Sequence, residues 1–139
     1  MERIRWARVF LGGLAAGVIL GVGEYVFHEY VLGARMQEAM STMGLENPTG
    51  SDIGIFTGMT LLLGFLLVWL YAAIRPRFGP GPRAAIVAGL FVWVLLYAFW
   101  YAYNLAWGLF PRDVIAASTV WGFFALPIAT LVGAWLYRE

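Results

Sequence analysis

The sequence predicts an all-α integral membrane protein, a four-helix bundle that forms a single domain over residues 1–139. The first observation behind this prediction is composition. Hydrophobic residues make up 62% of the chain and charged residues only 12%, and the mean hydropathy is +0.78. A soluble domain has about 25% charged residues, so this chain has too few charges to cover a surface that faces water. The near balance of 9 basic and 8 acidic side chains also argues against a nucleic-acid partner.

The second observation is the length of the apolar stretches. A helix needs about 20 mostly apolar residues to cross the hydrocarbon core of a bilayer. Four stretches qualify, over residues 8–32, 54–74, 84–107 and 114–137. Their apolar residues are continuous and do not alternate, which favours helices over the strands of a barrel. The sequence therefore predicts four transmembrane helices with the lipid bilayer as their first partner.

The loops between these helices contain ordinary turn and cap signals. Residues 75–83 hold three prolines and two glycines, which predicts a stiff non-helical turn. Asn47 and Pro48 mark another turn, and Ser51 or Asp52 is expected to cap the second transmembrane helix. Between the first two spans, residues 34–43 have the spacing of a short amphipathic helix that lies on the membrane surface.

The arginines predict the orientation of the chain. Most of them precede the first span, follow the fourth span or lie in the loop that holds Arg75, Arg77 and Arg83. The positive-inside rule then predicts that both termini and this loop are cytoplasmic. The three loop arginines can also contact anionic lipid head groups, but their role in topology is the favoured interpretation.

Small residues recur at helical spacing on the first and fourth helices. On one face of each, they are Gly13, Gly17 and Gly21, and Gly122, Ala125, Ala129 and Gly133. Such faces allow helix backbones to approach closely in lipid. The favoured hypothesis from these faces is a non-catalytic accessory or scaffold subunit, which packs against other membrane-protein chains or against itself.

Polar residues gather in the predicted outer half of the bundle. Glu24 and His28 continue the glycine face of the first helix, and the third helix has one stripe at 100° per residue that contains Trp93, Tyr97, Trp100 and Asn104. These residues predict either a polar, aromatic-lined pocket or a polar packing layer. Because a carboxylate inside a span is costly, Glu24 is either a ligand or proton site or a link to Asn104, Tyr97 or an indole. The alternative function is therefore a small-molecule binder or a proton-coupled transporter.

No cofactor is expected from the ligand types present. His28 is the single histidine and the chain has no cysteine, so a complete metal site is not predicted. Haem ligation by His28, and a Cu(I) site at Met36, Met40 and Met43, remain weaker alternatives. The methionine spacing equally suits the apolar face of a surface helix, which is favoured. The chain also lacks a nucleophile–base pattern and a phosphate-binding loop, so it is not predicted to be an enzyme.

The run from Trp69 to Pro82 carries a resemblance to known sequences. It resembles an uncharacterised family of small bacterial four-span integral membrane proteins that share an Arg-Pro-Arg-aromatic-Gly-Pro-Gly-Pro turn. Gly23-Glu24-Tyr25-Val26 is the corresponding feature of the first helix. The resemblance implies a protein of the bacterial inner membrane and implies no particular activity.

Overall fold

The computed structural model describes residues 3–46 and 48–138, which form helices and turns without a strand. Two of the long helices contain a π-helical segment, in which each turn is wider than in an α-helix. The elements in chain order are α1 (Trp6–Val26), η1 (Phe27–Leu32), α2 (Gly33–Thr42), α3 (Gly50–Phe78), α4 (Pro82–Trp93), η2 (Val94–Ala98), α5 (Phe99–Trp107) and α6 (Arg112–Arg138).

Four continuous helices are long and apolar enough to cross a membrane. They are Trp6–Thr42, Gly50–Phe78, Pro82–Trp107 and Arg112–Arg138. The predicted all-α class and the predicted number of spanning helices are confirmed. Each helix begins before its predicted start, three of the four also end later than predicted, and α2 follows η1 without an intervening loop. The orientation of the chain and the surface position of residues 34–43 stay predictions.

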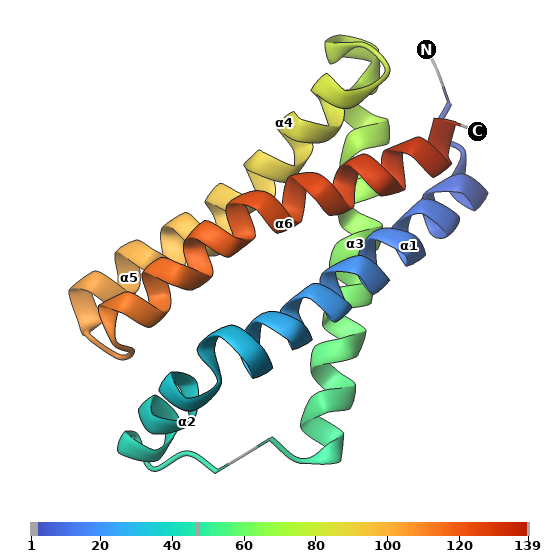
Figure 1. The fold of residues 1–139 in the computed structure, drawn as a ribbon. Helices are drawn as coiled ribbons and strands as arrows, with labels where there is room; N and C mark the ends of the chain where they lie inside the picture. The colour runs from blue at the N-terminus through green and yellow to red at the C-terminus, as the bar shows by residue number, and fades with distance from the viewer. Residues whose placement is uncertain (1–2, 47, 139) are drawn as a thin grey trace.

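The helices form two pairs that meet near one end of the molecule (Figure 1). One pair is α6 with the α4–α5 helix, and the other is α1, which crosses α3. Both chain ends and the α3–α4 turn lie at one end, which we call the terminal end. At the opposite end, which we call the loop end, lie α2, the start of α3 and the α5–α6 turn. Towards this loop end α1 and α6 diverge.

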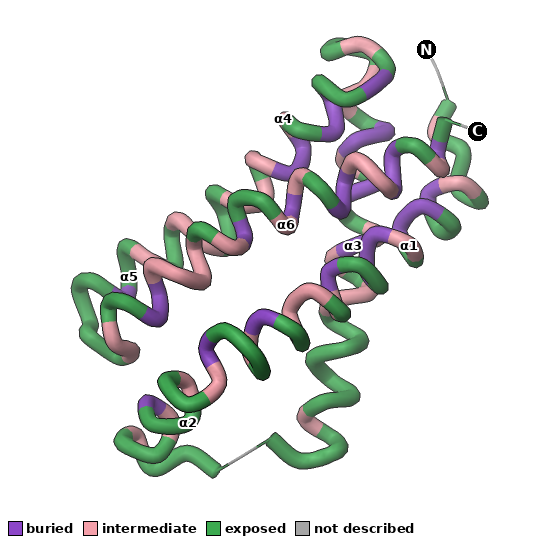
Figure 2. Tube along the Cα trace, viewed as in Figure 1, coloured by how far each residue is buried: buried purple, intermediate pink, exposed green. Residues whose placement is uncertain are grey.

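The tightest packing lies in the terminal half, where glycines let backbones touch. A Cβ atom on Gly64 of α3 would collide with the backbone of Gly17 on α1. A Cβ atom on Gly133 of α6 would lie 2.8 Å from the carbonyl oxygen of Gly12. The buried core surrounds these crossings, whereas the loop-end half of α3 is exposed (Figure 2). Close backbone approach stabilises helix pairs in lipid, where hydrophobic burial does not drive association.

The turn between α3 and α4 is shorter than predicted. Residues 75–78 form the last turn of α3 with Pro76 inside it, and residues 82 and 83 begin α4, so the predicted non-helical turn over 75–83 is right only for residues 79–81. Pro76 lacks the N–H that would bond to the carbonyl four residues earlier, whereas Pro82 stands in the first turn of α4, where the N–H has no partner within the helix. Gly79 and Gly81, with φ of 84° and 118°, reverse the chain.

The cap of α3 also differs from the prediction. The N-cap is Thr49, so the prediction of Ser51 or Asp52 is wrong. Asp52 is instead the third helical residue, and its carboxylate accepts hydrogen bonds from the backbone N–H and the hydroxyl of Thr49, both at 2.8 Å. This is the half of the capping box in which the third helical residue bonds back to the N-cap, and it satisfies the backbone donor of Thr49. In the turn predicted just before it, Asn47 lies outside the described residues.

Candidate functional site

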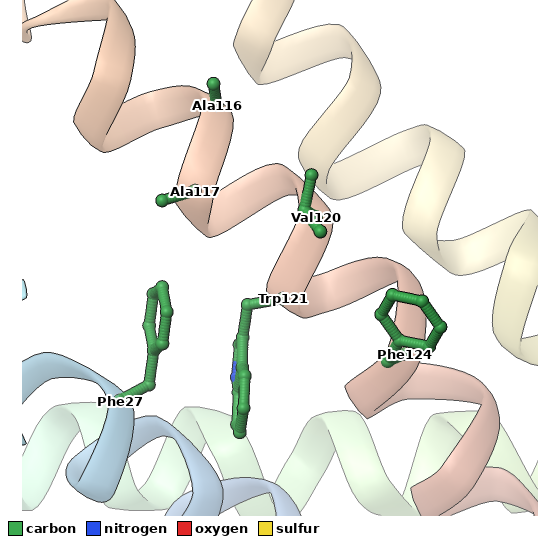
Figure 3. Close-up of a pocket in the computed structure, with 6 residues that line it drawn as sticks. All are labelled: Phe27, Ala116, Ala117, Val120, Trp121 and Phe124. Carbon is green, nitrogen blue, oxygen red and sulfur yellow. The ribbon is translucent and has the colours of Figure 1, made fainter. Parts of the chain in front are cut away.

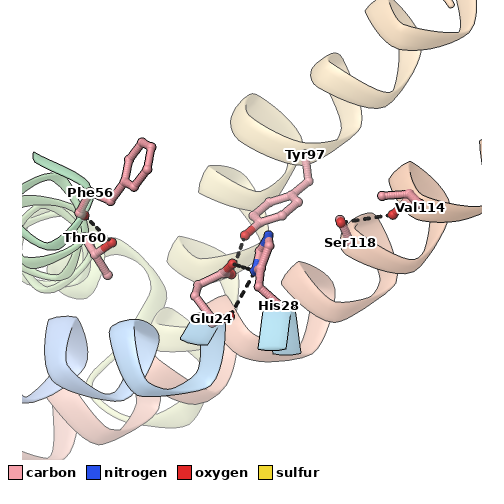
Figure 4. Close-up of polar contacts among 7 residues, drawn as sticks. All are labelled: Glu24, His28, Phe56, Thr60, Tyr97, Val114 and Ser118. Atoms are coloured by element: carbon pink, nitrogen blue, oxygen red, sulfur yellow. Dashed lines mark hydrogen bonds and ion pairs between the residues drawn. The ribbon is translucent and has the colours of Figure 1, made fainter. Parts of the chain in front are cut away.

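The most notable polar contact between helices joins Glu24, His28 and Tyr97 (Figure 4). The Tyr97 hydroxyl donates a hydrogen bond of 2.9 Å to Oε1 of Glu24. Nδ1 of His28 lies 2.9 Å from the backbone oxygen of Glu24 and 3.3 Å from its Oε2. These three residues come from α1, η1 and η2, and we call them the polar cluster. Its members Glu24 and His28 were predicted to share one face, and Tyr97 was one of the expected partners of Glu24.

Both partners of Glu24 lie in π-helical segments. His28 is in η1 and Tyr97 is in η2. Such segments are rare inside α-helices and are frequent at functional sites, because the wider turn re-aims side chains at a cost in helix geometry. Two of them meet at a single carboxylate here. This coincidence marks the polar cluster as the strongest candidate site among the described residues.

Gly122 on α6 makes room for the Tyr97 side chain. A Cβ atom at Gly122 would lie 2.6 Å from Cε2 of the Tyr97 ring. Tyr97 therefore crosses α6 at a glycine on its way to Glu24 on α1. The small-residue face of α6 accordingly accommodates an aromatic side chain at this position, and not a second helix backbone.

An open apolar groove of about 430 Å³ lies between η1 and α6 (Figure 3). Its lining residues come from η1 and α6 and are Phe27, Ala116, Ala117, Val120, Trp121 and Phe124. The rings of Phe27 and Trp121 stack with centroids 4.9 Å apart. Trp121 also packs against Gly23, the residue before Glu24, and its indole Nε1 is buried without a hydrogen-bond partner. None of the polar-cluster side chains lines the groove, but the Phe27 ring contacts the His28 ring edge-on with centroids 5.7 Å apart, so Phe27 lies between the groove and the cluster.

Sequence reasoning missed this groove as a site. Phe27 is one residue before His28, and Trp121 is one residue before Gly122, so both stand beside residues that the sequence did single out. These neighbouring positions pointed to the region of the groove. They could not predict the groove itself, because its existence depends on how far η1 and α6 lie apart.

The other residues of the predicted third-helix stripe separate in the structure. Trp93 donates a hydrogen bond of 2.8 Å to the backbone oxygen of Thr119 on α6. Trp100 is 45% exposed, so the prediction that it points into the protein is wrong. Asn104 is buried but bonds to the backbone of Phe110 at 2.8 and 3.0 Å, and thereby holds the α5–α6 turn. The π-helical turn of η2 explains the difference, because the 100° rotation assumed for each residue does not hold through it.

Four hydroxyl groups near the polar cluster and the loop end form hydrogen bonds within their own helices. Thr57, Thr60, Ser118 and Thr119 each donate to the backbone oxygen four residues earlier in the same helix, at 2.7 to 3.0 Å. Such bonds satisfy the hydroxyl donor in lipid without any contact from a second helix. Of the predicted polar layer, the side-chain contacts that join two spanning helices are therefore those of the polar cluster and the bond from Trp93 to Thr119.

The predicted small-residue faces pack largely inside the chain. Gly13 and Gly17 lie against Phe65 and Leu61 of α3, and Gly21 lies near the methyl group of Thr60. On α6, Gly133 faces α1, Ala129 is buried and Ala125 packs against the core. These contacts hold the bundle together, so the faces do not by themselves leave a surface for a partner chain.

The weaker metal candidates lie near the loop end. Among the described residues, no group of three or more His, Cys, Asp or Glu side chains could hold a metal ion. Met36, Met40 and Met43 are all half-buried on α2 and the residue that follows it. Met36 packs against the apolar cluster of Phe27, and Met43 lines a second groove of about 290 Å³ at the α5–α6 turn.

The comparisons with known proteins add no assignment to this geometry. No protein-family model, curated protein or solved structure matches the chain.

Proposed function

We propose that this chain is an integral membrane protein that binds an amphiphilic small molecule from the bilayer. The polar group of the ligand would bind at the polar cluster, and its hydrocarbon part would lie in the adjoining groove. The observation that carries this proposal is the meeting of a carboxylate, an imidazole and a phenol beside an apolar groove of about 430 Å³. Apolar walls with a few convergent polar groups are typical of ligand sites.

A purely structural role accounts less well for the carboxylate. An amide in place of Glu24 would accept the same hydrogen bond from Tyr97 and would not require a charge in a membrane span. The side chains of Glu24 and His28 also keep 30% and 42% of their surface exposed. A group that only joined two helices would gain from complete burial, whereas a binding group must stay accessible.

The chemistry of the site favours a cationic amphiphile. The Glu24 carboxylate is bonded to the phenol of Tyr97, and two further rings pack against its neighbours, Phe27 against His28 and Trp121 against Gly23. Carboxylates and aromatic faces both attract ammonium groups. The groove residues Val120 and Phe124 offer only hydrocarbon surface, which suits an alkyl chain. We therefore infer that the ligand class is the lipophilic amines.

The proposed location is the bacterial inner membrane, with both termini in the cytoplasm. The support is the excess of arginines in the segments of the terminal end, together with the resemblance of the α3–α4 turn. In this orientation the loop end faces outward, and the groove opens in the outer leaflet. Whether bound ligand is also moved across the membrane in exchange for protons is a further step, which a flux assay in liposomes tests.

Three probes of equal chain length test the proposal. Radiolabelled octylamine, octanol and octanoate are dialysed to equilibrium against the full chain in lipid nanodiscs and against empty nanodiscs. We expect saturable binding that is strongest for octylamine and weakest for octanoate. Glu24→Gln should remove most of the preference for octylamine, because it removes the charge and keeps the shape. Equal binding of the three probes, or an unchanged preference in Glu24→Gln, would contradict the proposal.

Groove variants separate ligand binding from stability. Val120→Trp fills the groove from a side chain that is 60% exposed, so the core is not disturbed. We expect it to weaken octylamine binding and to leave the melting temperature unchanged. Ile128→Trp is the matched control, because Ile128 is also exposed on α6 and does not line the groove.

An accessory or scaffold subunit is the second candidate function. One observation favours it: in the loop-end half of α3, a Cβ atom at Gly54 or Gly58 would meet nothing within 4 Å. Because the chain has no cysteine, Gly58→Cys gives a single cross-linking site, with Ile128→Cys on exposed α6 as the control. A disulfide-linked dimer in membranes for Gly58→Cys alone would support this function. Monomers for both variants would count against a second copy on this face.

A further inference from the structure

The terminal end gathers arginines from four segments of the chain. They lie before and at the start of α1, in the last turn of α3, at the start of α4 and at the end of α6. In chain order they are Arg3, Arg5, Arg8, Arg75, Arg77, Arg83 and Arg138. The only acidic residues of the sequence near these segments are Glu2 and Glu139, which lie outside the described residues. The arginines outnumber these acids, so this end has an excess of positive charge.

A buried tyrosine organises these arginines. Arg8 donates from Nη1 to the backbone oxygen of Tyr137 at 3.2 Å, and the backbone N–H of Arg5 donates to its hydroxyl at 3.3 Å. The guanidinium carbon of Arg75 lies 5.6 Å from the centroid of the Tyr137 ring, as in a cation–π contact. Three helices are therefore tied together at Tyr137, and two of the arginine side chains, Arg8 and Arg75, are held at this residue.

The α3–α4 turn is fixed to the same centre. Tyr71 packs edge-on against Tyr137 with ring centroids 5.8 Å apart, and the Tyr71 hydroxyl accepts a hydrogen bond of 3.3 Å from the backbone N–H of Gly81. A Cβ atom at Gly81 would lie 3.5 Å from Nη1 of Arg138. The turn that carries Arg77 and Arg83 is thus held beside the arginines of the chain ends.

We infer that this arginine cluster binds the head group of an anionic phospholipid in the leaflet at the terminal end. Guanidinium groups match phosphate oxygens in charge and geometry. Exposed aromatic side chains, Trp6 and Phe78, lie on the same segments as the arginines, and such residues anchor the ends of membrane spans at the level of the head groups. A soluble phosphate compound would not need that apolar border, so the bilayer lipid is the ligand.

Topology alone does not require this arrangement. The positive-inside effect depends on how many basic residues flank the spans, and exposed, disordered arginines would serve it equally well. Here Arg8 and Arg75 are half-buried and are held by defined contacts with Tyr137. Basic sites between helices at the membrane interface are typical of specific binding to anionic lipids.

Native mass spectrometry of the full chain tests the inference. The protein is released from micelles that contain equal amounts of dioleoyl phosphatidylglycerol and dioleoyl phosphatidylcholine. We expect retained phosphatidylglycerol to exceed retained phosphatidylcholine. The double variant Arg8→Gln, Arg75→Gln should lower phosphatidylglycerol retention by about fivefold or more, because each basic residue near the head groups adds to the attraction. Arg112→Gln at the loop end is the matched control and should leave retention unchanged.

The remaining outcomes are equally decisive. Equal retention of the two lipids by the unaltered chain would overturn the inference, and so would an equal loss in Arg112→Gln. If an excess of glycerol phosphate displaces phosphatidylglycerol, the site accepts a soluble phosphate and the lipid assignment is wrong. The double variant Arg8→Lys, Arg75→Lys keeps the charges, so partial retention is expected from it. The comparison of the two lipids on the unaltered chain holds even if a glutamine variant fails to fold.

Discussion

The two halves of the bundle are built in different ways. In the terminal half, α1 and α3 touch backbone to backbone where Gly17 meets Gly64, and α1 and α6 touch where Gly12 meets Gly133. In the loop half the helices diverge, and side chains bridge them through the Glu24–Tyr97 hydrogen bond and the stacked rings of Phe27 and Trp121. We infer that stability is concentrated in the terminal half, which leaves the loop half free to carry a site.

The largest effect on stability is expected from matched glycine variants of α3, one in each half of the bundle. Gly64→Ala should lower the free energy of unfolding by about 2 to 3 kcal/mol, because the new methyl group would collide with the backbone of Gly17, which cannot move aside cheaply. Gly58→Ala has open space and should leave stability unchanged or slightly higher. Equilibrium unfolding in mixed micelles with increasing dodecyl sulfate measures both. Similar losses in the two variants would show that the halves do not differ in packing.

The hydrogen bond between Glu24 and Tyr97 should contribute less to the free energy of unfolding than the contact at Gly64. A double-mutant cycle of Glu24→Ala and Tyr97→Phe should give a coupling free energy of about 1 kcal/mol, which is typical of interhelical hydrogen bonds in membranes. The control cycle pairs Glu24→Ala with Trp93→Phe. Trp93 bonds to Thr119 and not to Glu24, so these two changes should be additive. Additivity in both cycles would mean that the polar cluster does not couple α1 to η2.

The smallest effect is expected at the loop-end surface. Arg35 on α2 donates two hydrogen bonds to Asp113 on α6, at 2.6 and 3.0 Å, and both residues are exposed. Asp113→Asn should leave the unfolding transition unchanged, because water and salt screen such a pair. Amide hydrogen exchange in α2 should nevertheless become faster, because this pair ties α2 to α6. Glu38→Gln is the control, since Glu38 pairs with Arg35 within α2 at 3.6 Å and joins no second helix.

The sequence predicted the parts of this protein that depend on local pattern. Apolar stretches of sufficient length gave the four spanning helices, and the i, i+4 spacing of Glu24 and His28 put them on one face. The assignment of Tyr97 as a partner of Glu24 was one of three options, because helical spacing alone does not say which neighbour approaches. The inward placement predicted for Trp100 failed because Trp100 lies beyond the π-helical segment η2, where the assumed rotation per residue breaks down, whereas Asn104 is buried as predicted but bonds to Phe110.

By itself, then, the sequence determined that the chain is helical, how many helices can span a bilayer and where the charged residues fall along them. Those properties follow from the cost of leaving backbone groups and charges without partners in hydrocarbon. Only the tertiary structure decided that the helices cross closely in one half and diverge in the other. That divergence opens the groove at Trp121. It also leaves room for the Tyr97 side chain, which packs on Gly122 and donates its hydrogen bond to Glu24. The physical reason is that crossing positions depend on contacts between residues far apart in the chain, such as Gly17 and Gly64, which no local period encodes.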